Sequence, residues 1–267
     1  MVPEATATRG PLARVGAGVL DVLQVLGEGW LLFLRTIRTL PYVGRDRQRV
    51  VAQLVRVGTE TLPIGALLSM FVGMVLVLQA ADQLRQVSQG VLGPLVGLSM
   101  TKEMGPVMMA FLLAGRAGSA MAAEVGSMAV YDEINALRTM DIDPVRYLVL
   151  PRFVAATVAL PMLVLYADFI GVLGGAAIVG LDPAIKISLT EYFARMLEWV
   201  HFQDIFVGLV KAVVFGAVAS ILPCTFGFRT RGGTEGIATS TTAAVVWSFV
   251  LILLFDFLIV RVSFAFT

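Results

Sequence analysis

The chain is 267 residues long, and 58% of its residues are hydrophobic while only 15% are charged. A soluble domain is about 45–50% apolar and about a quarter charged, so this composition excludes an ordinary soluble enzyme, a disordered scaffold and a secreted disulfide module. The net charge of +1 is too small for a nucleic-acid binder, and one cysteine and one histidine are too few for a disulfide framework or a metal site.

The first predicted element is an amphipathic helix that ends before Pro41. Apolar side chains recur along it at steps of three and four, which is the spacing of one helix face. Because the charged residues fall largely on other faces, we expect this helix to lie in the membrane interface; the alternative is a helix packed on other protein. We take residues 1–58 as a cytoplasmic N-terminal region with this helix, and residues 59–267 as the transmembrane domain. The apolar stripe consists of Leu12, Val15, Val19, Val22, Leu26, Trp30, Phe33 and Ile37.

Five segments that follow are apolar over about the 20 residues that a bilayer span requires. Together they predict an all-α integral membrane protein with five transmembrane helices. Between the third and fourth spans, Ser188 and Glu191 fit a capping box and predict a short helix on the outer side. Its Tyr192, Met196 and Trp199 form a stripe that we expect to rest on the bilayer surface. The spans are residues 61–81, a segment from about Leu92 to Ala123, and residues 153–181, 212–228 and 236–255.

The arginines predict the orientation of the chain. Eight of them, from Arg9 to Arg56, precede the first span, so the positive-inside rule places the N-terminus in the cytoplasm. Counting five spans from there places residues 82–91 outside, residues 124–152 and 229–235 inside, and the C-terminus in the periplasm.

Small residues recur every fourth position in two spans. In lipid, helices approach closely along such faces. We expect most of these residues to pack helices within the chain, with a dimer face as the alternative. They are Ala110, Ala114, Gly118, Ala122 and Gly126 in the second span, and Gly171 and Gly175 in the third.

Several ionisable residues fall at membrane depth, where such groups are rare and usually face a cavity or a partner. Glu103, beside Lys102, and Lys211 are equally compatible with a functional cavity and with structural pairing. For Asp168 and Asp256 we expect pairing or proximity to an interface. Two other functions would use the same groups. An intramembrane aspartyl protease would use Asp168 and Asp256. An ion-coupled secondary transporter would use Glu103 and Asp168 as proton carriers.

Arg116 is a further ionisable residue near the cytoplasmic end of the second span. We expect its long side chain to reach along the helix toward the interface and to snorkel there.

The inner segment between the second and third spans predicts a short amphipathic helix. Tyr131, Ile134 and Leu137 fall on one face, and Asp132, Glu133 and Arg138 flank it. Such a helix suits docking to a soluble partner, although an ordinary loop helix is equally compatible. No glycine precedes any lysine, so the chain lacks a phosphate-binding loop, and an ATPase that drove transport would be another chain.

Five motifs resemble the MlaE/YrbE permease family. The long central motif is GRAGSAMAAEVGSM at 115–128, followed by EINAL at 133–137 and DPVRYLVLPR at 143–152. FVGMVLVLQ at 71–79 and KEMGP at 102–106 also match, and the resemblance extends from about Val50 to the end of the chain.

The resemblance implies the permease subunit of an ATP-driven transporter that moves phospholipid between the inner membrane and the periplasm or outer membrane. It implies a homodimer in the bacterial inner membrane, two ABC ATPase subunits that bind ATP and Mg²⁺, and a hexameric MCE-domain protein. It leaves open a small regulatory subunit on the ATPase, the transport direction and the lipid head group. No cofactor and no catalytic residue is implied for this chain.

The resemblance also implies two sets of site residues. A lipid pocket between the protomers would use Leu78, Gln79, Lys102, Glu103 and Lys211. The segment that transmits ATPase motions would use Glu124, Tyr131, Asp132, Glu133, Ile134, Leu137 and Arg138. The sequence departs from the family pattern at Lys102, where arginine is common, at Ala81, where an aromatic residue occurs, and at Asn135, which is acidic in some relatives.

Overall fold

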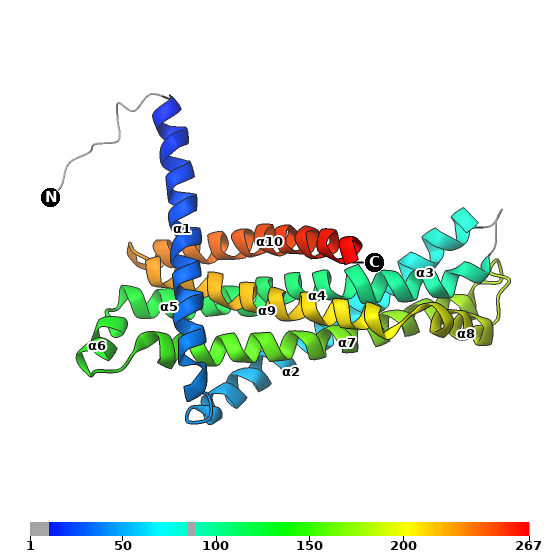
Figure 1. Ribbon diagram of the computed structural model, residues 1–267, viewed down its shortest axis with the longest axis horizontal. Coiled ribbons are helices and arrows are strands. Elements are labelled where there is room, and N and C mark those ends of the chain that lie inside the picture. Colours follow the sequence, from blue (N-terminus) through cyan, green and yellow to red (C-terminus); the bar gives the residue numbers. More distant parts are fainter. Residues whose placement is uncertain (1–10, 85–88, 267) are drawn as a thin grey trace.

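The structure, a computed structural model, describes residues 11–84 and 89–266, and in these the chain is a bundle of long helices (Figure 1). Five helical segments are long and apolar enough to cross a membrane. They run through Arg47–Gln83, Leu92–Val130, Val145–Leu181, Phe202–Arg229 and Gly233–Ser263. The prediction of an all-α protein with five transmembrane helices is thus confirmed for the described residues. Arg9, used above for the orientation, and residues 85–88 of the predicted outer segment lie outside them.

From α1 to α8, the described chain contains thirteen helical segments. They are α1 (Pro11–Thr39), η1 (Leu40–Tyr42), α2 (Arg47–Gln83), η3 (Gln89–Val91), α3 (Leu92–Ser99), η4 (Met100–Met104), α4 (Gly105–Leu113), η5 (Ala114–Gly118), α5 (Ser119–Val130), α6 (Glu133–Thr139), η6 (Val145–Val149), α7 (Leu150–Leu181) and α8 (Leu189–Trp199). Two further long helices, α9 (Phe202–Arg229) and α10 (Gly233–Phe266), complete the bundle. The boundary expected between residues 58 and 59 falls inside α2.

Helix α1 lies crosswise over one end of the bundle, and its N-terminal half extends beyond the other helices (Figure 1). Its end at Thr39 agrees with the stop predicted from Pro41. The residues that α1 buries against the bundle are Val25, Gly29, Leu32 and Thr36.

The apolar stripe predicted for α1 is therefore rotated from the face that contacts protein. Trp30 and Ile37 are exposed, and Val22, Leu26 and Phe33 are half-buried. The side chains of the stripe before residue 20 lie outside the described part. Small residues on the buried face let α1 approach α9 closely, which leaves the large apolar groups at the edge of the contact and on the outside. An exposed apolar surface on a crosswise helix is what an interfacial helix requires.

Helices α2 and α7 form the most extensive pair in the bundle. Every fourth residue of α2 is buried, because this spacing keeps one narrow face toward its neighbour. A side chain at Gly73 would overlap the carbonyl oxygen of Gly171, so the two backbones touch there. Internal packing of the predicted small residues is confirmed at Gly171 and Gly175. The buried residues of α2 at this spacing are Val57, Thr61, Gly65, Ser69, Gly73, Val77 and Ala81.

The second span packs by the same principle against α9. All five of its predicted small residues are buried. Gly118 faces Ala219 and Pro223 of α9, and Gly126 faces Thr230 just beyond the end of α9. The expectation of helix packing within the chain is confirmed here as well.

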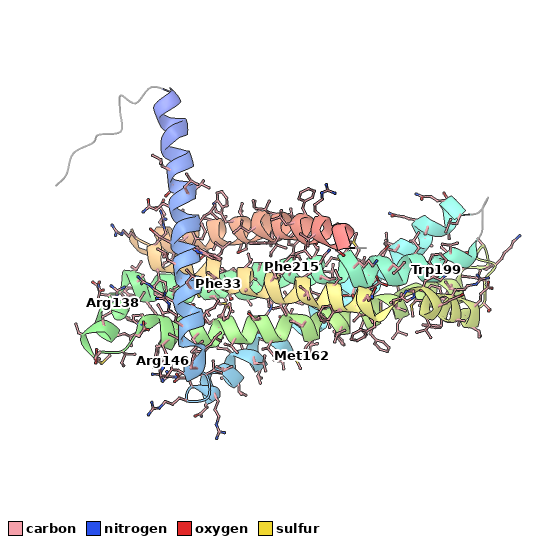
Figure 2. The ribbon with its side chains drawn as sticks, viewed as in Figure 1. Phe33, Arg138, Arg146, Met162, Trp199 and Phe215 are labelled. Atoms are coloured by element: carbon pink, nitrogen blue, oxygen red, sulfur yellow. The ribbon has the colours of Figure 1, made fainter. Side chains whose placement is uncertain are left out.

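Helices α6 and α8 occupy opposite ends of the bundle, as Arg138 and Trp199 show in Figure 2. Helix α8 begins where predicted, because the Ser188 side chain accepts a hydrogen bond of 3.1 Å from the Glu191 backbone N–H.

The expected contact of the α8 stripe with the bilayer is wrong for two of its three residues. Tyr192 is fully buried and Met196 packs on Gly97 of α3, while Trp199 is exposed. A side chain at Gly93 would overlap the carbonyl of Tyr192, so α3 offers α8 a glycine-lined surface that accommodates these large groups.

Candidate functional site

A buried lysine lies at the centre of a charged cluster between the second, fourth and fifth spans. The Lys211 side chain on α9 is only 1% exposed. Its Nζ lies 2.8 Å from Glu103 Oε2 and 2.8 Å from Asp256 Oδ1 on α10. It also donates a hydrogen bond of 2.9 Å to the carbonyl oxygen of Lys102. A charge at membrane depth is costly unless it is paired, and these contacts supply the pairing.

A second ion pair continues the cluster toward the α8 end. The Nζ of Lys102 lies 2.7 Å from Asp204 Oδ1, near the start of α9. Lys102 is nearly half-exposed there, whereas Asp204 is largely covered. We define the charged cluster as Lys102, Glu103, Asp204, Lys211 and Asp256.

The backbone at Lys102 and Glu103 is a π-helical turn, η4. A π-turn inserts one extra residue into a helix and is frequent at functional sites. The Gly105 N–H donates to the Met100 carbonyl across this turn. Two other π-turns in the described chain, η5 and η6, also carry a charged residue with a distant partner: Arg116 pairs with Glu60 of α2, and Arg146 pairs with Asp46 just before α2.

The predicted lipid-binding set is brought together only in part. Lys102, Glu103 and Lys211 meet, but Leu78 and Gln79 are exposed on α2 and lie apart from this cluster. An open hollow of about 490 Å³ lies on α10 and includes none of the five predicted residues. It is lined by Ala238, Thr239, Thr242, Ala243, Val246 and Trp247.

Sequence reasoning did not identify Asp204 and Asp256 as partners of the two lysines. Asp256 is paired, as expected for a carboxylate at membrane depth. Its partner is Lys211 of α9, and nothing in the linear sequence indicates that these two residues meet. Asp204 follows His201 by three residues and accepts a hydrogen bond of 2.9 Å from the His201 backbone N–H, which is a helix-capping pattern. That pattern locates the start of α9 but does not predict the contact with Lys102.

Asp168 on α7 is buried and lies against Gly105 at the C-terminal end of η4. Its Oδ1 has no hydrogen-bond partner among the described residues. No ion pair of Asp168 is found among the described residues, so the expected pairing is not met there, while the alternative, proximity to a membrane interface, stays a prediction.

The predicted docking helix forms as α6, but its apolar face is not the one expected. Ile134 and Leu137 are buried in the protein's own core, whereas Tyr131 is 66% exposed. The reason is that Asp132 has a left-handed backbone, with φ of 59°, which separates Tyr131 from α6 and changes the direction of the chain. The exposed surface, which we call the α6 outer face, comprises Tyr131, Asp132, Glu133, Asn135, Arg138 and Met140.

Glu124 connects three helices and does not belong to the α6 outer face. Its carboxylate lies 2.6 Å from Arg56 of α2 and 2.9 Å from the buried Arg152 of α7. Arg152 also donates a hydrogen bond of 2.8 Å to the Leu148 carbonyl oxygen. The position of Glu124 between these two arginines favours a structural role, as a bridge between helices at the α6 end of the bundle.

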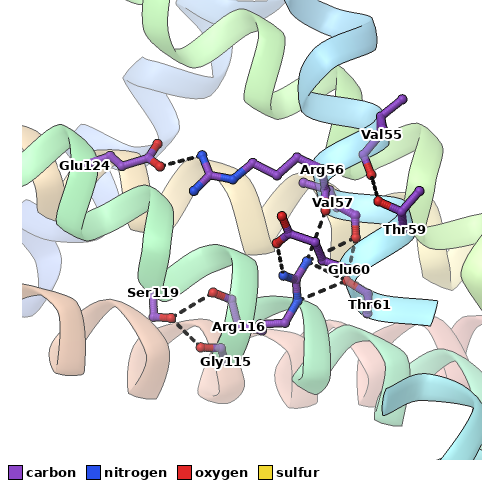
Figure 3. A network of polar contacts seen from close by, with 10 residues as sticks. All are labelled: Val55, Arg56, Val57, Thr59, Glu60, Thr61, Gly115, Arg116, Ser119 and Glu124. Carbon is purple, nitrogen blue, oxygen red and sulfur yellow. Dashed lines mark hydrogen bonds and ion pairs between the residues drawn. The ribbon is translucent and has the colours of Figure 1, made fainter. Parts of the chain in front are cut away.

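Arg116 is held by α2 (Figure 3). Its guanidinium lies 2.6 Å from Glu60 and donates hydrogen bonds to the Thr61 hydroxyl and the Val57 carbonyl. The side chain is therefore paired with protein groups, and its expected reach to the membrane interface stays a prediction.

Comparison with known proteins identifies the family of this arrangement. The family model described as "Permease MlaE" matches residues 50–262. A probable ABC transporter permease protein of Rickettsia felis is 38% identical over 94% of this chain and 96% of its own length. A probable ABC transporter permease protein of Rickettsia typhi is 38% identical over 80% of this chain and 83% of its own. The intermembrane phospholipid transport system permease protein MlaE of Haemophilus influenzae is 32% identical over 95% of this chain and 97% of its own.

Proposed function

Because the chain belongs to the MlaE permease family, we propose that it is the permease subunit of an ATP-driven transporter that moves phospholipid between the inner membrane and the periplasm or outer membrane. Such transport would maintain the lipid asymmetry of the outer membrane. The name of the Haemophilus influenzae relative supports phospholipid as the substrate, and the five apolar spans support the membrane location.

The observation that carries this proposal is the charged cluster around Lys211. A phosphate group that approaches from the α8 end would be attracted by Lys102, which is nearly half-exposed. Lys211 lies deeper and is shared by two carboxylates, so a phosphate has to compete with them for it. We propose that Lys102, Glu103 and Lys211 bind the head group, with Leu78 and Gln79 contributing from exposed α2 positions when a second copy of the chain completes the pocket.

The α6 outer face supports docking to an ATPase. It combines an exposed tyrosine and methionine with charged groups at one end of the bundle (Figure 2). We propose that ATP and Mg²⁺ are bound by a partner ATPase on each protomer of a homodimer and that α6 transmits ATPase motion to the spans. A hexameric MCE-domain protein would dock at the α8 end, and a small regulatory subunit on the ATPase is compatible with this arrangement.

The orientation follows from the same assignment. The α6 end carries the arginines of the inner segments, so it faces the cytoplasm together with the N-terminus, and the C-terminus faces the periplasm. Helix α1 would then lie in the cytoplasmic interface of the inner membrane.

The two alternative functions are less well supported. Membership in a family of ABC transporter permeases argues against a gradient-driven carrier and against a protease. Asp256, which a protease would need beside Asp168, is engaged by Lys211 at 2.8 Å.

Charge reversal on the α6 outer face tests the docking role. In the variant Glu133→Lys with Arg138→Glu, we expect the amount of ATPase that copurifies with the permease to fall about ten-fold, because charged contacts at an interface centre are worth 1–3 kcal/mol. Both residues are exposed, so the fold is not affected. The measurement is the ratio of ATPase to permease after purification from native membranes.

The matched control reverses an ion pair on α8, at the opposite end of the bundle. Glu191 and Arg195 lie 3.7 Å apart on α8, and the variant Glu191→Lys with Arg195→Glu is expected to retain the ATPase. Equal retention by both variants would show that the ATPase does not dock on α6. Leu137→Asp is unsuitable for this test because Leu137 is part of the core.

A further inference from the structure

A polar recess lies between α2 and the η5–α5 segment, on the α6 side of the bundle (Figure 3). It has about 30 Å³ of free space, which is room for one or two groups the size of a water molecule. The small side chains of Ala117 on η5 and Ala120 on α5 form part of its lining, and four long charged side chains contribute most of its polar groups. The full lining is Gln53, Arg56, Val57, Glu60, Arg116, Ala117, Ala120, Met121 and Glu124.

The charges of this recess are balanced and only partly covered. Two ion pairs, Arg116 with Glu60 and Arg56 with Glu124, each span the gap between the helices at 2.6 Å. The side chain of Glu60 is 54% exposed and that of Arg56 is 49% exposed, so both still present charge to the outside. Each of these four charges already has a partner, so a ligand has to exchange with an ion pair. A ligand with one positive and one negative group can replace both members of the pair it opens, whereas an anion alone would take the arginine and leave the carboxylate with less compensation.

The recess lies at the depth of lipid head groups. The uncharged part of α2 comprises residues 61–81, which at 1.5 Å per residue is about 30 Å long and matches the hydrocarbon core. Arg56 and Glu60 precede this part directly. Exposed apolar side chains flank them on α2, namely Val55 and Ile64, where acyl chains would lie.

We propose that this recess binds the head group of a zwitterionic phospholipid with a primary ammonium group, such as phosphatidylethanolamine. The ammonium, which is about the size of a water molecule, would enter the free space that Glu60 and Glu124 both line and displace Arg56 from Glu124, while the phosphate binds the displaced Arg56 guanidinium at the rim. A trimethylammonium group is too large for the free space, and an anionic head group lacks the cation. The recess is separate from the charged cluster, because Glu103 and Arg116 are 13 residues apart on one helix, or about 20 Å. The proposal rests on the proposed function in one respect, namely that the α6 end of the bundle lies at the cytoplasmic leaflet.

Photocrosslinking from the recess tests the proposal on the full chain with its copurified partners. Benzoylphenylalanine at Gln53 is irradiated in nanodiscs with equal parts of phosphatidylethanolamine, phosphatidylcholine and phosphatidylglycerol, and the adduct mass identifies the lipid. We expect phosphatidylethanolamine adducts to exceed each of the others about ten-fold, since one charge-assisted hydrogen bond is worth about 1.5–3 kcal/mol. This preference is measured without any change to the charged residues.

Two further variants make the test specific. Ala120→Leu fills the recess and is expected to reduce the phosphatidylethanolamine adduct about ten-fold, whereas Ala52→Leu, an exposed position of α2 outside the lining, leaves it unchanged. Lys102→Gln, at the half-exposed end of the charged cluster, is expected to leave the adduct unchanged even where it reduces transport, which separates this site from the charged cluster. Equal labelling of the three lipids, no effect of Ala120→Leu, or adducts with a second copy of the chain instead of lipid would each overturn the proposal.

Discussion

Lys211 shows how a single charged side chain is accommodated inside a membrane-spanning bundle. Its side chain is almost fully buried, and its charge is balanced by Glu103 and Asp256 on two other helices. The cluster has two lysines and three carboxylates in total, so the loss of either cation leaves carboxylates without compensation. Breaking a buried pair is costly for this reason, even though an intact pair contributes little net stability.

Substitution of Lys211 by methionine is expected to destabilise the protein by about 3–5 kcal/mol, because Glu103 and Asp256 then face one another without the cation. The measurement is the midpoint of thermal unfolding in detergent, which should fall clearly. Adding Asp256→Asn to Lys211→Met removes one uncompensated charge and should restore part of the loss. If the double variant is less stable than Lys211→Met alone, the electrostatic explanation is wrong.

At the scale of the element, α2 illustrates packing without a hydrophobic driving force. Lipid tails are as apolar as leucine, so helices in a membrane associate where small residues let backbones approach. On α2 the small and medium residues recur every fourth position, and Gly73 marks the closest approach to α7.

Gly73→Val is expected to separate α2 from α7, because the new side chain would overlap the Gly171 carbonyl oxygen. A cost of about 1–3 kcal/mol follows from overpacking, measured as a lower midpoint of thermal unfolding. Gly58→Val is the control on the same helix, since a side chain there meets no atom within 4 Å. Equal destabilisation by both variants would indicate a general effect of valine in α2 and not the contact with α7.

The bounds of the helices were largely predictable from the sequence, but the faces that they bury were less predictable. The end of α1 follows from Pro41, and the start of α3 at Leu92 follows from the apolar run. For α6 the apolar residues were identified correctly, yet Ile134 and Leu137 point into the protein. Periodicity gives the residues of one face but not what covers it, because a core and a partner both favour apolar side chains.

At the scale of the whole molecule, polar contacts connect α1 and its connector to the bundle. Arg229 at the end of α9 lies 2.7 Å from Asp21 of α1, and Arg146 of η6 lies 2.9 Å from Asp46. Tyr147, next to Arg146, stacks under Arg49. The first contact joins α1 to the end of α9, and the other two join the connector after α1 and the first turn of α2 to η6.

Removal of two of these contacts is expected to loosen α1. In the variant Asp46→Asn with Tyr147→Leu, the two ion pairs of Asp46, with Arg146 and Arg49, and one cation–π contact are lost, worth about 1–2 kcal/mol together. Amide hydrogen exchange in residues 30–50 should then be about ten-fold faster. Arg45→Gln serves as the control at a neighbouring exposed position. Unchanged exchange in the double variant would show that apolar contacts alone hold α1.

The amino-acid sequence by itself determined the class of the protein, the five spans, the small-residue faces and the family. These properties depend on composition, local periodicity and contiguous motifs, which a linear sequence contains in full. The sequence also indicated Lys102, Glu103 and Lys211 as unusual, because a charge at membrane depth is recognisable without knowledge of its neighbours.

Only the tertiary structure decided which groups those charges meet. Asp204 and Asp256 lie about a hundred or more residues from Lys102, and Arg116 and Arg56 find their partners on other helices in the same way. Such pairings depend on the rotation of each helix about its axis, and three π-turns and two left-handed aspartates, Asp132 and Asp141, change the direction of the described chain. The physical reason is that a rotation of one residue, about 100°, is enough to exchange a buried face for an exposed one.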